Sequence, residues 1–126
     1  MTHAPNPPRV LIADDHPGML ATLRRLLSVE CEVIGTVADG TLLLEMAARL
    51  QPDVVLADLN MPGLNGFEAC RQLTRSNARV KVILLSGVDN AEIARQARHA
   101  GACAFFVKYR LSPPELLAAI THQGTP

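Results

Sequence analysis

Short apolar runs alternate five times with longer segments that repeat an apolar residue every third or fourth position. The runs predict buried parallel strands over 10–13, 32–37, 53–58, 80–85 and 104–107. The periodic segments predict amphipathic helices, because that spacing places side chains on one helix face. The first helix carries its stripe on Leu20, Leu23 and Leu27, and the last on Leu116, Leu117 and Ile120.

Helix-boundary signals agree with this pattern. Pro17 suits the first helical position, where the missing N–H costs nothing. Asn65 and Ser112 each precede a glutamate by three positions, which is the pattern of a capping box. Gly101 is a candidate for the residue that ends the fourth helix.

Five strand–helix units predict an α/β domain of the doubly wound, flavodoxin-like (βα)5 type. Right-handed crossovers place helices on both faces of a parallel sheet, giving three layers, and strand order 2-1-3-4-5 is the common solution. The helix before Gly101 offers little apolar area through Ile93, Ala94, Ala97 and Ala100. At roughly 25 cal/mol per Å² of buried surface, we expect it to be held loosely and to be able to move.

Composition narrows the class of protein. A chain of 126 residues is one domain, and with 48% hydrophobic but 3% aromatic residues its core must be aliphatic. Twelve basic residues balance twelve acidic ones, which argues against direct binding of nucleic acid or an anionic membrane. Without a signal peptide or an apolar stretch of membrane-spanning length, a cytoplasmic location is expected.

The three cysteines are odd in number and widely spaced, at Cys31, Cys70 and Cys103. In a reducing cytosol we expect them to be free, buried thiols. No two cysteine or histidine residues stand at ligand spacing, so a zinc-type site is not expected.

The unusual polar residues all come where a predicted strand ends. Asp14 and Asp15 follow the first strand, Asp58 ends the third, Ser86 the fourth and Lys108 the fifth. In a parallel sheet of the predicted order these ends lie along one edge, where open α/β folds place their chemistry. We therefore expect three carboxylates, a hydroxyl and an ammonium to share one cleft.

Three neighbouring carboxylates repel one another unless a cation is present. Oxygen ligands alone suit Mg²⁺, or Mn²⁺ in its place. A bound cation, a lysine and a hydroxyl around a further carboxylate are suited to phosphoryl transfer, with Asp58 as an aspartyl nucleophile.

At this point the chain resembles the receiver domains of response regulators in bacterial two-component signalling. The resemblance spans residues 9–122, leaving 1–8 as a disordered tail and 123–126 as a tail or the start of a linker. The start at Asp14-Asp15-His16-Pro17 and the segment from Ser112 to Ile120 resemble the LuxR/NarL-type subfamily. The other matching segments are 53–66, 84–87 and 101–108.

The resemblance implies a role for each matching residue of the cleft. Asp58 is the phosphoacceptor, Asp15 binds Mg²⁺ directly and Asp14 through water, and the backbone carbonyl of Asn60 is a further ligand. Ser86 and Lys108 hold the phosphoryl oxygens.

A readout is implied as well. Phe105 is the aromatic residue that turns inward when Ser86 is drawn to the phosphoryl group. The face formed by the fourth helix, fifth strand and fifth helix then changes shape for a partner.

The implied partners are a sensor histidine kinase and, as a further option, a second copy of the chain. The implied output is transcription through a DNA-binding domain that follows a receiver, although this chain ends at Pro126. One departure is Tyr109, which stands where many receivers have proline and leaves the next loop's geometry open.

Plainer interpretations remain for single residues. Asp14 and Asp15 also suit a turn and helix cap, Ser86 a turn, and Lys108 a solvated surface. Phe105 suits the core as well as a switch. His16 is expected to be a surface histidine without a part in the chemistry. The basic cluster formed by Arg71, Arg75, Arg79 and Lys81 is expected to be a solvated face.

Three other functions are weighed. A phosphatase with an aspartyl nucleophile needs an acid–base aspartate two residues on, where this chain has Asn60. An FMN-binding module needs a phosphate-cradling loop after the first strand, where Asp14 and Asp15 repel phosphate. A receiver that works only as a phosphorylation-independent interaction module fits the same fold. We expect a signalling switch rather than an enzyme.

Overall fold

A computed structural model describes residues 6–122 of the chain. Of the tails predicted at 1–8 and 123–126, residues 1–5 and 123–126 lie outside the described residues. Within residues 6–122, five strands and five α-helices alternate, with a short 3-10 helix, η1 (Lys108–Arg110), after the last strand. The strands are β1 (Arg9–Ala13), β2 (Glu32–Val37), β3 (Val54–Asp58), β4 (Lys81–Ser86) and β5 (Ala104–Val107). The helices are α1 (Pro17–Leu27), α2 (Gly40–Leu50), α3 (Gly66–Ser76), α4 (Ala91–His99) and α5 (Pro113–Thr121).

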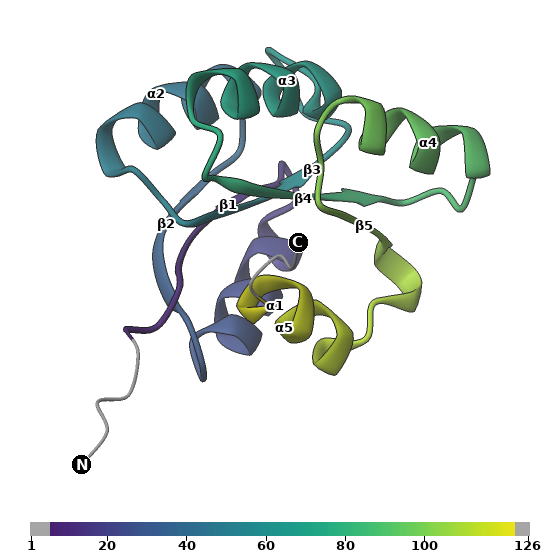
Figure 1. Ribbon diagram of the computed structural model, residues 1–126. Helices are drawn as coiled ribbons and strands as arrows, with labels where there is room; N and C mark the ends of the chain where they lie inside the picture. The colour runs from purple at the N-terminus through teal and green to yellow at the C-terminus, as the bar shows by residue number, and fades with distance from the viewer. Residues whose placement is uncertain (1–5, 123–126) are drawn as a thin grey trace.

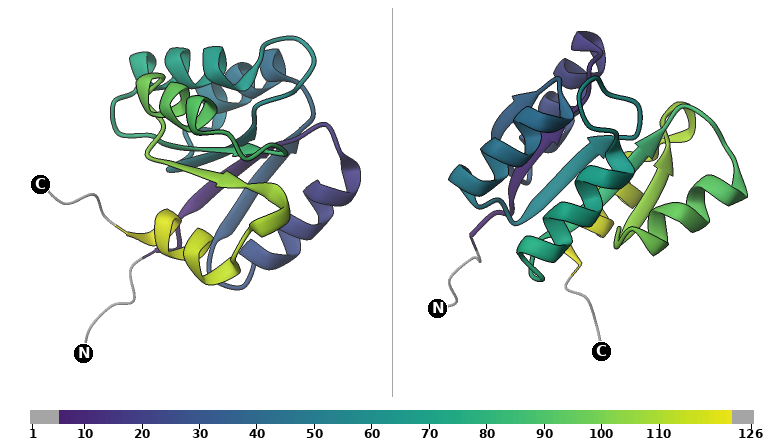
Figure 2. Two further views of the ribbon diagram at one scale, coloured as in Figure 1. Left: turned by 90° about the vertical axis from the view of Figure 1, so that its right-hand side faces the viewer. Right: turned by 90° about the horizontal axis from the view of Figure 1, so that it is seen from above.

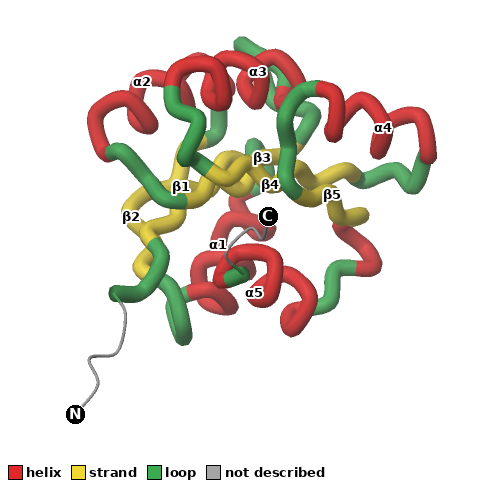
Figure 3. Tube along the Cα trace, viewed as in Figure 1, coloured by secondary structure: helices red, strands yellow, loops and turns green. Residues whose placement is uncertain are grey.

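The five strands form one parallel sheet in the order β2-β1-β3-β4-β5, which confirms the predicted topology. Helices α2, α3 and α4 cover one face of the sheet and α1 and α5 the other (Figures 1 and 2). Figure 3 shows the resulting three layers, with the yellow strands between red helices. Three strands differ from their predicted ranges by one residue: β1 begins earlier, at Arg9, β3 begins later, at Val54, and β4 is shifted to Lys81–Ser86.

The core lies in two clusters, one on each face of the sheet. Because successive strand residues point to opposite faces, Leu11 and Val55 belong to the cluster under α2–α4, and Ile12 and Leu56 to the one under α1 and α5. These side chains are aliphatic and fully buried. The central strands are therefore fixed from both sides, which fixes the positions of the polar residues at their ends.

The expected helix boundaries are confirmed. The side chains of Asn65 and Ser112 accept hydrogen bonds from the backbone N–H groups of Glu68 and Glu115. Gly101 follows α4 with a φ of 105°, a conformation that favours glycine. Ala97 is the only buried residue of α4, in keeping with the expected weak attachment of that helix.

Two expectations about single residues are wrong. Cys31 and Cys70 are free and buried, but Cys103 is exposed because it lies in the turn before β5. Lys81 is not part of a solvated basic face, since its ammonium donates hydrogen bonds to the carbonyls of Ala119 and Ile120 in the last turn of α5. No helix within residues 6–122 combines the length and hydropathy needed to span a membrane.

Candidate functional site

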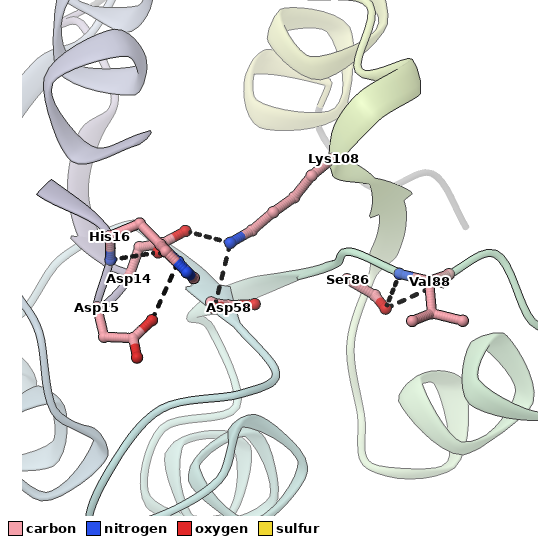
Figure 4. Close-up of polar contacts among 7 residues, drawn as sticks. All are labelled: Asp14, Asp15, His16, Asp58, Ser86, Val88 and Lys108. Atoms are coloured by element: carbon pink, nitrogen blue, oxygen red, sulfur yellow. Dashed lines mark hydrogen bonds and ion pairs between the residues drawn. The ribbon is translucent and has the colours of Figure 1, made fainter. Parts of the chain in front are cut away.

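Two carboxylates and an ammonium meet at the edge of the sheet where the strands have their carboxyl ends (Figure 4). Asp14 follows β1 and is fully buried, while Asp58 ends β3 and is 2% exposed. The Nζ atom of Lys108, after β5, lies 2.7 Å from Oδ2 of Asp14 and 3.2 Å from Oδ2 of Asp58. The lysine therefore bridges the two buried carboxylates, as expected from its position after a strand.

Asp15 and His16 border the same cluster on the side away from Lys108. One ligand atom each from Asp14, Asp15, His16 and Asp58 lies within 4.8 Å of the others. The Nδ1 atom of His16 is 3.0 Å from Oδ1 of Asp14 and 3.1 Å from Oδ1 of Asp15. Figure 4 shows the imidazole turned toward both carboxylates. The ring is 67% exposed, which confirms the expected surface position of His16, but the sequence did not predict its contacts with the two carboxylates.

The charges of the cluster shift the pKa values of its members. Burial raises the pKa of the Asp58 carboxyl and the charge of Asp14 adds to this, although Lys108 and the backbone N–H of Asn60 act in the opposite direction. Burial by itself would lower the pKa of Lys108, but its hydrogen bond to Asp14 and the charges of both carboxylates raise it overall. Lys108 therefore carries a positive charge at neutral pH. The pKa of Asp58 remains raised despite this neighbouring charge.

The hydroxyl of Ser86 does not join this cluster. Ser86 is buried at the end of β4, but its Oγ atom donates to the carbonyl of Val88 and accepts from the Val88 N–H, both at 3.0 Å. Figure 4 shows the side chain pointing away from Asp58. The sequence placed Ser86 at the correct edge of the sheet, but the hydroxyl bonds within its own loop.

The β4–α4 loop is tied to η1 by an ion pair on the surface. Oδ2 of Asp89 lies 2.6 Å from Nη2 of Arg110, and both side chains are more than half exposed. Tyr109 is 69% exposed, and the Arg110 guanidinium lies 5.7 Å from the centre of its ring. Tyr109 is the middle residue of the 3-10 helix η1, which follows β5 directly.

Phe105, the expected switch residue, is half-buried. It packs against the core cluster beneath α2, α3 and α4, whereas its neighbour Phe106 packs against the cluster on the other face. This position is compatible with both interpretations of Phe105, as core residue and as mobile aromatic.

The loop from Leu59 to Asn65, which carries Asn60, is held by close backbone contacts. The N–H of Gly40 donates to the carbonyl of Pro62 at 3.0 Å, and a Cβ on Gly40 would stand 1.9 Å from the Leu64 carbonyl oxygen. Gly63 has a φ of 82° and lies against the carboxylate of Asp39. The later part of this loop, from Pro62 to Leu64, is therefore held against the start of α2.

The residues of the cluster fit a hard divalent cation. Three carboxylates supply oxygen ligands, and Lys108 occupies only the Oδ2 atoms of Asp14 and Asp58. Asp15 is partly exposed, which gives a hydrated ion access. The side chains that would hold Mg²⁺ are Asp14, Asp15 and Asp58.

Sequence reasoning missed two contacts of this edge, the approach of His16 to the carboxylates and the Asp89–Arg110 pair. The position of His16 directly after two aspartates was the only signal for the first. No periodic pattern marks the second.

Most of the chain is similar in sequence to known proteins. Residues 10–121 match the family described as "Response regulator receiver domain". The chain is 33% identical over 120 residues to the nitrate/nitrite response regulator protein NarL of Escherichia coli K12, covering 94% of this chain and 55% of the relative. It is 41% identical over 105 residues to a protein-glutamate methylesterase/protein-glutamine glutaminase of Methanospirillum hungatei, covering 79% of this chain and 30% of the relative.

A solved structure gives the same likeness in three dimensions. The signal receiver domain of the putative response regulator NarL from Mycobacterium tuberculosis superposes with a TM-score of 0.84 at 34% identity, covering 92% of this chain and 94% of that one. By contrast, the chain spans only about half or less of the length of the two curated relatives. The match to each of them is confined to that part of its length.

Proposed function

The chain belongs to the response regulator receiver family, and on that basis we propose that Asp58 accepts a phosphoryl group in the presence of Mg²⁺. One Oδ of Asp58 attacks the phosphorus of a donor, the bond from phosphorus to the leaving group breaks, and the leaving group departs with the electron pair. The product is an acyl phosphate on Asp58.

The observation that carries the proposal is the pairing of a buried nucleophile with a fixed cation. Asp58 is 2% exposed and Lys108 lies 3.2 Å from its Oδ2 atom. Lys108 is positioned to attract an incoming phosphoryl group and to stabilise its charge after transfer. A bound Mg²⁺ supplies further neutralisation of the phosphoryl oxygens.

Asp14, Asp15, Asp58 and the backbone carbonyl of Asn60 are the proposed ligands of this ion, with Mn²⁺ as a substitute. The carboxylates would hold the ion, and the Asn60 carbonyl would supply a further oxygen ligand.

Ser86 and Phe105 are the proposed readout. After phosphorylation, the Ser86 hydroxyl leaves Val88 and donates to a phosphoryl oxygen, and Phe105 turns into the space beside it. The β4–α4 loop and the face formed by α4, β5 and α5 then change shape. A helix with a single buried residue is suited to this change, because few contacts oppose its displacement.

The proposed donor is a sensor histidine kinase, and the proposed output is control of transcription through a DNA-binding domain outside this chain. The likeness to NarL, a nitrate/nitrite response regulator, supports this output over an enzymatic one. The methylesterase relative is the reason to keep an enzymatic partner domain as the second option. The receiver is proposed to span residues 9–122 and to work in the cytoplasm, with self-pairing as a further interaction.

Intact mass measurement after incubation with Mg²⁺ and acetyl phosphate tests the proposal. We expect wild type to gain the mass of one phosphoryl group, and Asp58→Asn to gain none. Asp53→Asn is the matched control, because Asp53 lies just before the start of β3, at the opposite edge of the sheet, and its carboxylate accepts a hydrogen bond from the backbone N–H of Arg9. An unlabelled wild type would favour the phosphorylation-independent module, and many turnovers of a phosphomonoester would favour the phosphatase.

A further inference from the structure

His16 lies at the acidic cluster, and its side chain does not cap helix α1. It occupies the N-cap position, where serine, threonine, aspartate or asparagine usually accepts a backbone N–H with its side chain. The His16 side chain makes no such bond. Its backbone N–H instead donates to Oδ1 of Asp14 at 2.9 Å, which holds the residue beside the carboxylates.

The two nitrogen-bearing side chains take opposite sides of Asp14. Lys108 contacts the Oδ2 atoms of Asp14 and Asp58, whereas the His16 ring contacts the Oδ1 atoms of Asp14 and Asp15. Asp15 is the more exposed carboxylate and borders the open side of the cluster. A cation that approaches from solvent therefore meets Asp15 and the His16 ring together.

We propose that His16 is itself a ligand of the divalent cation held by this cluster, and that it biases the site toward cations that accept imidazole. Mg²⁺ favours oxygen ligands, whereas Ni²⁺, Zn²⁺ and, to a smaller degree, Mn²⁺ gain from an imidazole nitrogen. The inference rests on the proposed cation site, and adds a nitrogen ligand to the oxygen set. The ring is 67% exposed, so it is free to reorient toward a bound ion.

The alternative is that His16 serves only as a hydrogen-bond partner of the carboxylates. Asparagine separates the two roles, because its amide still donates hydrogen bonds to a carboxylate but is a poor ligand for Ni²⁺. A ligand role thus predicts a loss specific to the imidazole-accepting cation. A hydrogen-bonding role predicts no change, or an equal change for all cations.

Titration calorimetry with Mg²⁺ and Ni²⁺ on wild type, His16→Asn and His99→Asn tests this difference. His99 is an exposed histidine at the end of α4 and provides the matched control. We expect His16→Asn to weaken Ni²⁺ binding by at least roughly tenfold, the size typical of losing a group that supports a metal site. Mg²⁺ binding should change by less than about threefold, and His99→Asn should resemble wild type.

Pulsed electron paramagnetic resonance of bound Mn²⁺ gives a second readout. We expect coupling to an imidazole ¹⁴N nucleus in wild type and in His99→Asn, and its loss in His16→Asn. Equal weakening of both cations, unchanged Ni²⁺ binding, or nitrogen coupling that persists in His16→Asn would each overturn the proposal while leaving the Mg²⁺ site in place. A wild type that binds no divalent cation would overturn the proposed Mg²⁺ dependence as well.

Discussion

The edge of the sheet that bears the site has two parts, and they differ in whether their functional side chains already contact one another. On the acidic side, Asp14 and Asp58 are buried and already joined by Lys108. On the side of the β4–α4 loop, Ser86 bonds to Val88 of its own loop, and residues 87–92 are exposed. The groups proposed to bind and react are in position, whereas the group proposed to report the reaction is not.

This difference has a physical basis in what each part must do. Preorganised charges lower the cost of forming a charged product, since they need no rearrangement when the reaction occurs. A switch must instead have two arrangements of similar free energy, which requires weak contacts in at least one of them. Buried ion pairs suit the first requirement, and an exposed loop suits the second.

The largest expected effect concerns Lys108. Replacing it with alanine leaves two buried carboxylates without their cation, so we expect Lys108→Ala to lower the free energy of unfolding by about 3 kcal/mol. Urea unfolding at neutral pH in metal-free buffer measures this. Lys81→Ala is a useful reference, because Lys81 bonds to backbone carbonyls rather than to a carboxylate. A loss below about 1 kcal/mol for Lys108→Ala would mean that water already solvates the acidic side.

Added Mg²⁺ should stabilise the acidic side specifically. A ligand that binds only the folded state at 100 times its dissociation constant contributes about 2.7 kcal/mol. We expect this gain in wild type and its loss in Asp15→Asn, as measured by thermal unfolding with and without Mg²⁺. Asp89→Asn, which alters a carboxylate of the β4–α4 loop, should keep the full gain. Equal gains in all three proteins would indicate that the ion binds elsewhere.

The raised pKa of Asp58 predicts the sign of a pH dependence. Because the folded pKa lies above the unfolded one, the stability that protonated Asp58 contributes is present below about pH 4 and is lost as pH rises through the folded pKa. Asp58→Asn removes this loss, so we expect it to be more stable than wild type at pH 7. The difference should shrink toward pH 4 in denaturant titrations without Mg²⁺. A variant less stable than wild type at pH 7 would show that the Lys108 pair outweighs the cost of burial.

The smallest effect should come from the surface ion pair of the other part. Arg110 and Asp89 are both more than half exposed, and such pairs typically contribute about 0.2–1 kcal/mol. We therefore expect Arg110→Ala to change the free energy of unfolding by less than about 1 kcal/mol, with a further decrease of the effect in high salt. The Lys108 and Arg110 variants measured under the same conditions compare the two parts directly. Similar losses would remove the distinction between them.

The sequence predicted the strands and the helix starts, because these follow from hydrophobic period and capping chemistry. It predicted strand order, and with it the edge at which the polar residues meet, because one order is common for five strand–helix units. It did not predict the hydroxyl direction of Ser86 or the imidazole direction of His16. Both depend on side-chain torsions that respond to neighbours within two residues. The exposure of Cys103 was missed for a related reason, since a turn before a strand carries no periodic signal. Lys81 was misjudged because its partners are carbonyls of α5, distant in sequence.

The close backbone packing of the loop from Leu59 to Asn65 limits which amino-acid substitutions the chain tolerates. Gly40 has no charge and no chemistry, yet any side chain there would enter the Leu64 carbonyl. Gly66 is similar, because a Cβ there would lie 2.7 Å from the Asp58 carbonyl oxygen. In a library of all single substitutions selected for signalling, variants with any other residue at Gly40 or Gly66 should be depleted as strongly as variants that replace Asp58. Gly18, where a Cβ would meet no atom within 4 Å, should accept most residues.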